Sequence, residues 1–166
     1  MKKILAVLAI MFTASFVMGD GYSRFTKTWE GFSPTPYKDA EGRSIGYGFF
    51  LNRADASIRL KAVGVTGEMR VTKDQAQALL AGDIQRSIED CKKMFPSFDS
   101  LPRNVRLVLV DLNYNLGSTR FRKFKKFRAA VNRRDWDASA AELVSSLWFE
   151  QVGKRSRNHV AMLRSL

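Results

Sequence analysis

The pattern of apolar and charged residues separates an uncharged N-terminal stretch from a long region of short amphipathic segments. Lys2 and Lys3 precede a run from Ile4 to Gly19 that contains no charged residue. A positive start followed by an apolar stretch of this length is typical of a secretion signal. We therefore expect export, with residues 1–19 acting either as a signal cleaved after Gly19 or as a weak membrane anchor that releases the chain intact.

Residues 22–30 carry apolar side chains at helical spacing, and Gly31 is suited to end that helix. The pattern changes over residues 33–50, which contain two prolines, a turn-forming stretch and a run of glycines and strand formers. Proline disfavours helix, whereas β-branched and aromatic residues favour strands. Residues 33–50 therefore predict a small β-hairpin or three short strands.

A long helix is predicted next, after a short helix at residues 52–63 and a loop at residues 64–70. Thr72 and Gln75 have the spacing of a capping box, in which each side chain satisfies the backbone N–H of the other residue. Behind them, apolar residues repeat at helical spacing until a proline ends the pattern. We expect one helix over about residues 73–95.

The C-terminal part predicts several further helices. Ser100 is placed to cap a helix that extends to Gly117 and is apolar nearly all round, which indicates a buried position. Asp135 is placed to cap a later helix. The remaining helical segments are expected at residues 120–132, 136–146 and 154–164.

These elements predict a mainly helical α+β fold, and a chain of 166 residues is too short for two independent domains. We expect one domain at residues 20–166. Within it, a small lobe with the β-hairpin (about residues 20–71) and a helical lobe (about residues 96–166) are joined by the long helix.

The net charge and the scarcity of cysteine and histidine exclude several classes of functional site. The net charge of +12 and the pI of about 10.2 indicate attraction to polyanions. Cys91 and His159 are the only residues of their kinds, which excludes an intramolecular disulfide, a multi-histidine metal centre and a Ser-His-Asp triad placed elsewhere. Cys91 lies in an apolar helical stripe, where a buried structural thiol is a simpler interpretation than a nucleophile. We expect no metal and no cofactor.

Two carboxyl groups are candidates for chemistry. Glu30 lies at the end of the first predicted helix, Asp39 lies on the predicted hairpin, and Ser44 adds a hydroxyl beside a glycine-rich strand. Hydrolysis of a glycosidic bond needs two carboxyl groups, one protonated to donate to the leaving oxygen and one ionised. Acid pairs near glycines also occur by chance, so this spacing alone does not separate catalysis from coincidence.

The whole string resembles the active-site signature of phage-type lysozymes. The Glu-Gly, Tyr-x-Asp-x-x-Gly and Thr-Ile-Gly-x-Gly elements of that family correspond to residues 30–31, 37–42 and 44–48. The resemblance implies a lysozyme-like two-lobed fold with the active site in the groove between the lobes. It continues through the chain at residues 72–76, 113–117, 135–140 and 145–151 and at Arg155.

Transferred to this sequence, the resemblance makes Glu30 the general acid and has Asp39 and Ser44 hold an attacking water, which would invert the anomeric carbon. Arg155 matches a family arginine that pairs with the catalytic glutamate and orients it. Ser44 replaces the usual threonine, and one residue fewer than usual separates it from Asp39, so the hairpin must be tighter. Phe49 stands where the family often has a histidine, which removes a structural ion pair.

Sugar binding would involve Phe50 and Tyr114 facing each other across the groove, with Asn115 and Glu142 as polar contacts. The alternative for the aromatic residues is core packing, which we favour for Trp136 and Trp148.

Residues 120–128 form a basic run in which three phenylalanines share one face of the predicted helix. We expect a solvated helix that attracts anionic envelope polymers or a membrane surface. Membrane disruption is a second interpretation. Nucleic-acid binding is not expected, because no recognition motif accompanies the charge.

The resemblance implies an endolysin that hydrolyses the β-1,4 bonds between N-acetylmuramic acid and N-acetylglucosamine in peptidoglycan and lyses the host. We expect a monomer that acts on glycan strands, tethered to the inner membrane or free in the periplasm. A lytic transglycosylase and a non-enzymatic cationic membrane-disrupting protein are the alternatives.

Overall fold

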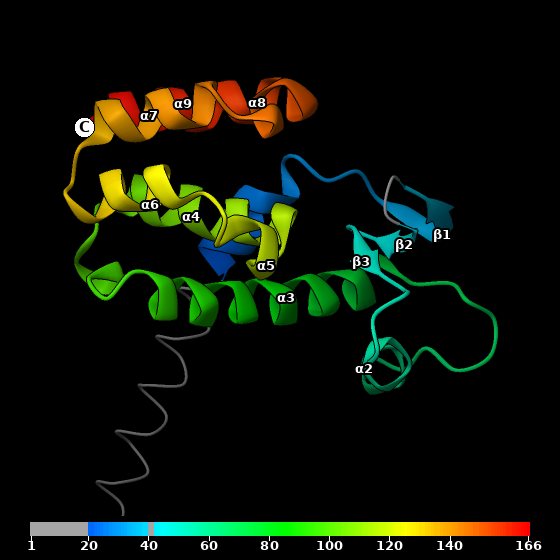
Figure 1. Cartoon of the computed structure of the whole chain (residues 1–166). Helices are drawn as coiled ribbons and strands as arrows, with labels where there is room; N and C mark the ends of the chain where they lie inside the picture. Colours follow the sequence, from blue (N-terminus) through cyan, green and yellow to red (C-terminus); the bar gives the residue numbers. More distant parts are fainter. Residues whose placement is uncertain (1–19, 40–41) are drawn as a thin grey trace, which may run out of the picture. The chain divides into compact units, whose positions relative to one another are not determined.

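The computed structural model describes residues 20–39 and 42–166 (Figure 1). Its contacts divide the chain into two compact units, the first ending at Gln85 and the second beginning at Arg86, inside the long helix α3 (Lys73–Met94). Residues 1–19, which include the uncharged stretch at residues 4–19, lie outside the described residues, so the interpretation of this stretch stays a prediction. None of the helices in the described ranges is both long and apolar enough to cross a membrane.

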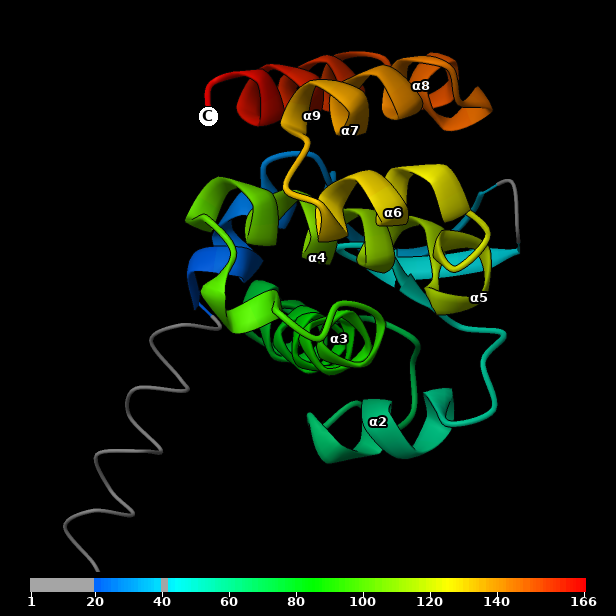
Figure 2. The ribbon, with the colours of Figure 1, turned by 60° about the vertical axis from the view of Figure 1, so that its left-hand side comes forward.

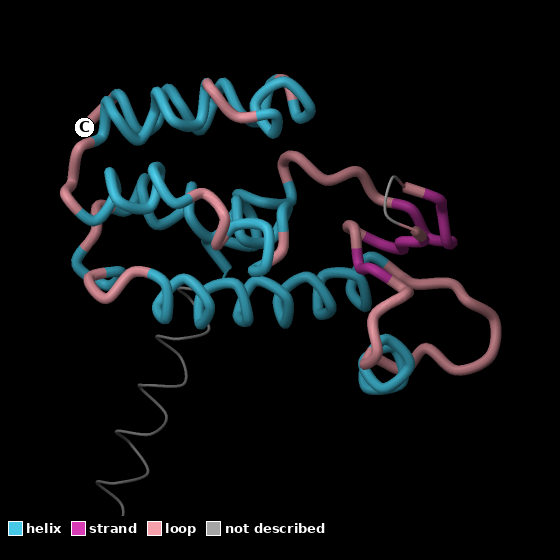
Figure 3. Tube along the Cα trace, viewed as in Figure 1, coloured by secondary structure: helices cyan, strands magenta, loops and turns pink. Residues whose placement is uncertain are grey.

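The first unit contains a small antiparallel sheet, as predicted, with the strand order β1-β2-β3 (Figure 3). The predicted mainly helical α+β fold is confirmed. The elements before α3 are helical residues 20–27, β1 (Ser33–Lys38), β2 (Arg43–Gly46), β3 (Phe49–Phe50) and α2 (Ala56–Ala62).

The first helix ends earlier than predicted. It stops at residue 27, and Thr28 and Trp29 form a tight turn by donating their N–H groups to Phe25 and Thr26. Gly31 does not adopt the left-handed conformation of a helix-ending glycine.

Both prolines of the 33–50 region lie in β1, where the edge of the sheet tolerates the missing N–H groups. The pairing with β2 is irregular between Ser33 and Tyr37 and becomes regular at Tyr37–Ser44.

Helix α2 begins later than the predicted residue 52, because residues 51–55 form turns held by ion pairs. Arg53 contacts Asp55 at 2.5 Å and Asp83 at 2.8 Å, and Arg59 also pairs with Asp83. The Arg53 and Arg59 guanidinium groups lie 5.4 and 5.0 Å from the centre of the Phe49 ring. This cluster links α2 and the sheet to α3.

The capping box of α3 is confirmed. Gln75 donates its N–H to the Thr72 hydroxyl at 3.2 Å, and Thr72 donates its N–H to the Gln75 side chain at 2.9 Å. The helix ends at Met94, two residues before Pro96, within one residue of the prediction.

The second unit is helical, and its core is built around α4 (Arg103–Leu116). Helix α4 packs against α5 and α9, while α7 packs against α6, α8 and α9 (Figure 2). Val105, Val108, Leu109 and Leu112 have no exposed surface, so the predicted buried helix is confirmed. The other elements are η1 (Phe98–Ser100), α5 (Ser118–Phe121), α6 (Lys125–Asn132), α7 (Trp136–Val144), α8 (Leu147–Val152) and α9 (Lys154–Arg164).

Of two further predicted helix caps, one is confirmed and one is wrong. Asp135 caps α7 by accepting the Ala138 N–H at 3.0 Å, as predicted. Ser100 does not cap α4, because it belongs to η1 and its hydroxyl donates to the Ser97 carbonyl, whereas Pro102 occupies the cap position.

The prediction of one helix over residues 120–132 is wrong. Helix α5 ends at Phe121 and α6 begins at Lys125. The break lets Phe121 pack against both Phe124 and Phe127, with ring centres 6.3 and 6.1 Å apart. Phe121 and Phe127 are buried, so they belong to the core rather than to an exposed apolar face.

Cys91 is buried, as expected, and its thiol donates to the Leu109 carbonyl at 3.4 Å. Burial raises the pKa of this thiol.

Candidate active site

The candidate site of the first unit is built on the turn after residue 27 and on the β1–β2 hairpin. Glu30 follows the turn, outside regular structure, and is half-buried. The preceding turn is anchored by Phe25 and Trp29, whose rings meet edge to face at 6.3 Å. The backbone that carries Glu30 is therefore fixed by packing on its N-terminal side.

Asp39 and Ser44 are brought together by the hairpin. The Ser44 hydroxyl donates to Asp39 Oδ2 at 2.5 Å, and the Gly42 N–H donates to Asp39 Oδ1 at 2.9 Å. The Asp39 N–H donates to the Gly42 carbonyl at 3.0 Å. Both oxygens of the Asp39 carboxyl group are thus held, and Ser44, only 2% exposed, has little freedom to turn away.

The connection between β1 and β2 is short. Lys38 pairs with Arg43, so only residues 39–42 connect β1 to β2. At Gly42, a Cβ atom would lie 2.7 Å from the Asn52 side-chain oxygen, which accepts the Arg43 N–H at 2.9 Å. A larger residue at position 42 would therefore push the Asn52 side chain away from the Arg43 N–H at the start of β2, the strand that carries Ser44.

Tyr37 connects the two carboxyl groups electrostatically. Burial raises the pKa of its hydroxyl, and the negative charges of Glu30 and Asp39 raise it further. Both carboxylates therefore lie close enough to act on one phenol group. Sequence reasoning gave Tyr37 no role, although it is part of the motif that contains Asp39.

Phe50 lies beside the hairpin. It pairs with Ser44 in the sheet, and its ring would meet a Cβ atom of Gly42 at 3.0 Å. It is half-buried, so part of this residue remains accessible beside the strand that carries Ser44.

The remaining candidates lie in the second unit. Tyr114 and Glu142 are half-buried, and Asn115 is exposed. The Asn115 side-chain oxygen accepts the indole N–H of Trp148 at 2.7 Å, which gives this asparagine a structural contact. Trp148 is buried, as predicted, whereas Trp136 is half-buried. Sugar contacts by these residues stay predictions.

Arg155 belongs to a buried network that sequence reasoning missed. Its guanidinium group donates to both oxygens of Asp111, at 2.7 and 2.8 Å, and His159 Nε2 lies 2.7 Å from Asp111 Oδ2. Burial alone would raise the pKa of Asp111, but hydrogen bonds from His159 and Arg155 and their charges lower it to about 2. The structure thus fixes the Arg155 side chain on Asp111, and its predicted role toward Glu30 stays a prediction.

No group of three or more histidine, cysteine, aspartate or glutamate side chains in residues 20–39 and 42–166 is arranged to hold a metal ion.

Comparison with known proteins gives one family. The sequence model of the family described as "Phage lysozyme" matches residues 27–162. The "Peptidoglycan hydrolase gp36" of Enterobacteria phage SP6 is 32% identical over 128 residues, covering 74% of this chain but 13% of the phage protein. The protein of the same name from Pseudomonas phage phiKMV is 27% identical, again over 13% of its length. "Probable T4-type lysozyme 2" of Dictyostelium discoideum is 25% identical over 82% of this chain and 89% of that protein.

Proposed function

Since the chain belongs to the phage lysozyme family, we propose that it is an endolysin that hydrolyses bacterial peptidoglycan and thereby lyses the host. The bond cleaved would be the β-1,4 link between N-acetylmuramic acid and N-acetylglucosamine. The names of the two phage relatives, both peptidoglycan hydrolases, support the substrate class.

The observation that carries this proposal is the arrangement around Tyr37 and Ser44. Asp39 accepts a hydrogen bond from the Ser44 hydroxyl, and the charges of Glu30 and Asp39 both raise the pKa of the Tyr37 hydroxyl beyond the effect of its burial. Hydrolysis of a glycosidic bond requires two carboxyl groups, which Glu30 and Asp39 would supply, and the Ser44 hydroxyl is held on the second of them.

In the proposed reaction, Glu30 protonates the glycosidic oxygen as it leaves the anomeric carbon. Ser44 donates its proton to Asp39, so its oxygen lone pairs remain free to accept a hydrogen bond from a water. Asp39 and Ser44 then orient that water, and Asp39 takes its proton as the water attacks from the opposite side. This displacement inverts the configuration, and it requires carboxyl groups roughly 6.5–9.5 Å apart.

We assign the supporting roles in the same proposal. Phe50 would stack on a sugar beside the hairpin, and Tyr114, Asn115 and Glu142 would contact the glycan from the second unit. Arg155, held on Asp111, would orient Glu30. The enzyme would act as a monomer.

Purified protein with the substitution Glu30→Gln tests the proposal. Glutamine cannot donate a carboxyl proton, and general acid catalysis contributes roughly 10²–10⁴-fold. We expect no clearing of a peptidoglycan gel by the variant, with circular dichroism showing an intact fold. Turnover within tenfold of the unmodified enzyme would contradict the assignment.

Two measurements separate the proposed hydrolase from its alternatives: the mass of the products and the lytic activity of the Glu30→Gln variant. Hydrolysis yields reducing ends, whereas a transglycosylase yields anhydro sugars of lower mass, which mass spectrometry distinguishes. A protein that only disrupts membranes would lyse cells equally well with Glu30→Gln.

A further inference from the structure

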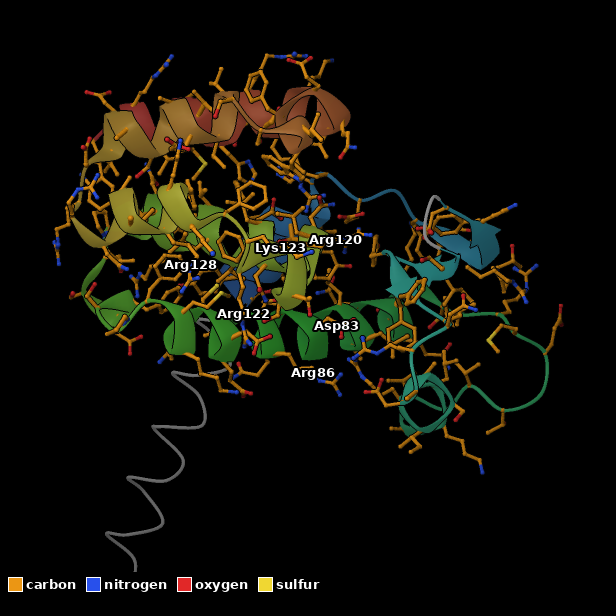
Figure 4. The ribbon with its side chains drawn as sticks, in the orientation of Figure 1. Asp83, Arg86, Arg120, Arg122, Lys123 and Arg128 are labelled. Carbon is orange, nitrogen blue, oxygen red and sulfur yellow. The ribbon has the colours of Figure 1, made fainter. Side chains whose placement is uncertain are left out.

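The segment from residue 118 to residue 134 carries eight basic residues and no acidic one. It comprises α5, the turn after it and α6, and Figure 4 marks four of its cations on these elements: Arg120, Arg122, Lys123 and Arg128. Nothing in the proposed hydrolysis uses this concentration of charge. We call the four residues Arg122, Lys123, Lys125 and Lys126 the basic surface.

All four side chains of the basic surface are exposed. Among the residues that the structure describes, none of them forms an ion pair, in contrast to Arg53, Arg59 and Arg155, which all contact carboxylates. Their mutual repulsion is therefore not offset by a neighbouring anion.

The basic surface does not stabilise the helix that carries it. Lys125 and Lys126 lie in the first turn of α6, which holds no acidic residue and has no side-chain cap. The N-terminal end of a helix carries partial positive charge, so two lysines there are unfavourable. These cations cost stability in the free protein, and an external anion would remove that cost.

The segment also lacks an apolar face that could enter a bilayer. Phe121 and Phe127 are buried in the core of the second unit, and Phe124 packs against Phe121. Binding through this surface would therefore be electrostatic, without the apolar insertion that membrane-disrupting amphipathic helices use.

We propose that the basic surface docks the enzyme on the phosphate headgroups of an anionic phospholipid bilayer. A membrane is favoured over a soluble polymer because the uncharged stretch at residues 4–19 predicts delivery to the inner membrane, whose surface is then the nearest dense array of phosphates. Clusters of four to eight lysines and arginines are typical of such surfaces, and each contributes roughly fivefold to binding. Docking would keep the enzyme close to the membrane-facing layer of its proposed substrate.

Vesicle sedimentation with the full-length protein tests this proposal. The probes are vesicles of phosphatidylcholine alone and vesicles that also contain phosphatidylglycerol. Only the phosphatidylglycerol-dependent part of the binding counts, because the uncharged stretch could insert into either vesicle. We expect the phosphatidylglycerol-dependent binding to weaken with added salt. Its affinity should fall by at least about a hundredfold when all four basic-surface residues are changed to glutamine.

A charge-matched variant provides the control. Changing Lys61, Arg70, Lys154 and Arg157 to glutamine removes the same charge from exposed positions outside the basic segment. This variant should keep binding within about threefold of the unmodified protein, since its basic surface is intact. Thermal unfolding checks that both variants are folded.

Three results would overturn the proposal. Equal losses in the two variants would mean that net charge, and not the basic surface, causes binding. Equal binding to both kinds of vesicle would mean that phosphate recognition is absent. Tight binding to soluble polyphosphate or DNA without binding to vesicles would assign the surface to a polymer.

Because docking is proposed for an endolysin, hydrolysis of peptidoglycan is measured separately. Vesicle binding without hydrolysis contradicts only the proposed function, and hydrolysis without vesicle binding contradicts only docking.

Discussion

Ser44 has a hydrogen bond and a degree of burial that its residue type alone does not reveal. Its hydroxyl donates to Asp39, and the residue is almost fully buried in β2. Serine lacks the methyl group with which a threonine restricts its own rotamers. In this chain, the closed hairpin and the hydrogen bond to Asp39 supply the restriction instead.

At this scale we expect Ser44→Ala to lower kcat by about tenfold or more with little change in KM. The substitution removes the hydrogen bond to the charged Asp39 and the oxygen that would hold the attacking water. Ser44→Thr should keep most activity, since it restores the hydroxyl.

NMR of the first product of the unmodified enzyme should show the α anomer. A β product, or an alanine variant as active as the threonine variant, would contradict the roles given to Ser44 and Asp39.

The sequence was sufficient to predict the pairing of Asp39 with Ser44 and insufficient to predict the interactions of Tyr37 and Asp111. Asp39, Gly42 and Ser44 are close in sequence, so a turn brings them together without any tertiary information. Tyr37 was missed because the rise in its pKa depends on burial and on the charges of Glu30 and Asp39, and the local sequence reveals neither. Asp111 was missed because its partners lie 44 and 48 positions later, and only the packing of two helices joins them.

At the scale of elements, the same distinction separates confirmed helix ends from wrong ones. The start of α3 and the cap of α7 depend on hydrogen bonds between residues three apart, and both were predicted. The break between α5 and α6 depends on the burial of Phe121 against two other rings, which no local pattern records.

The contact between α4 and α9 is the element-scale feature with the clearest energetic consequence. Asp111 on α4 bridges Arg155 and His159 on α9. Its pKa in the fold is about 2, below its ordinary value of 3.8. The ionised carboxylate therefore adds stability that is fully present above about pH 4 and is lost as the pH falls toward 2.

We expect Asp111→Asn to lower the free energy of unfolding by about 3 kcal/mol at neutral pH, because Arg155 keeps a buried charge without a carboxylate. The difference from the unmodified protein should shrink by about 2 kcal/mol between pH 4 and pH 2. Urea denaturation across this range measures both values. As a control, Glu150→Gln on the surface of α8 should change stability by less than about 0.5 kcal/mol. A pH-independent difference would contradict the assigned pKa.

At the scale of the whole molecule, the uncharged stretch at residues 4–19 predicts where the domain acts. Residues 4–19 would span about 24 Å as a helix, less than the roughly 30 Å of a bilayer core. The stretch also contains alanine, serine, threonine and glycine, so its insertion would be weak. We propose that it tethers the enzyme to the inner membrane and releases it intact into the periplasm.

Intact mass spectrometry of the enzyme recovered from the periplasm tests this release. A chain that begins at Met1 is expected, since a releasable anchor is not cut. A chain that begins at Asp20 would show an ordinary cleaved signal and would exclude release of the intact chain.

The burial of Cys91 has a consequence for passage between cell compartments. Thiol–disulfide exchange requires an accessible thiolate, and this thiol is enclosed in the core with a raised pKa and a hydrogen bond to Leu109. It is also the only cysteine of the chain. Once folded, the protein would therefore remain the same covalent molecule in the reducing cytoplasm and in the oxidising periplasm, and its maturation would need neither a thiol oxidase nor a disulfide isomerase.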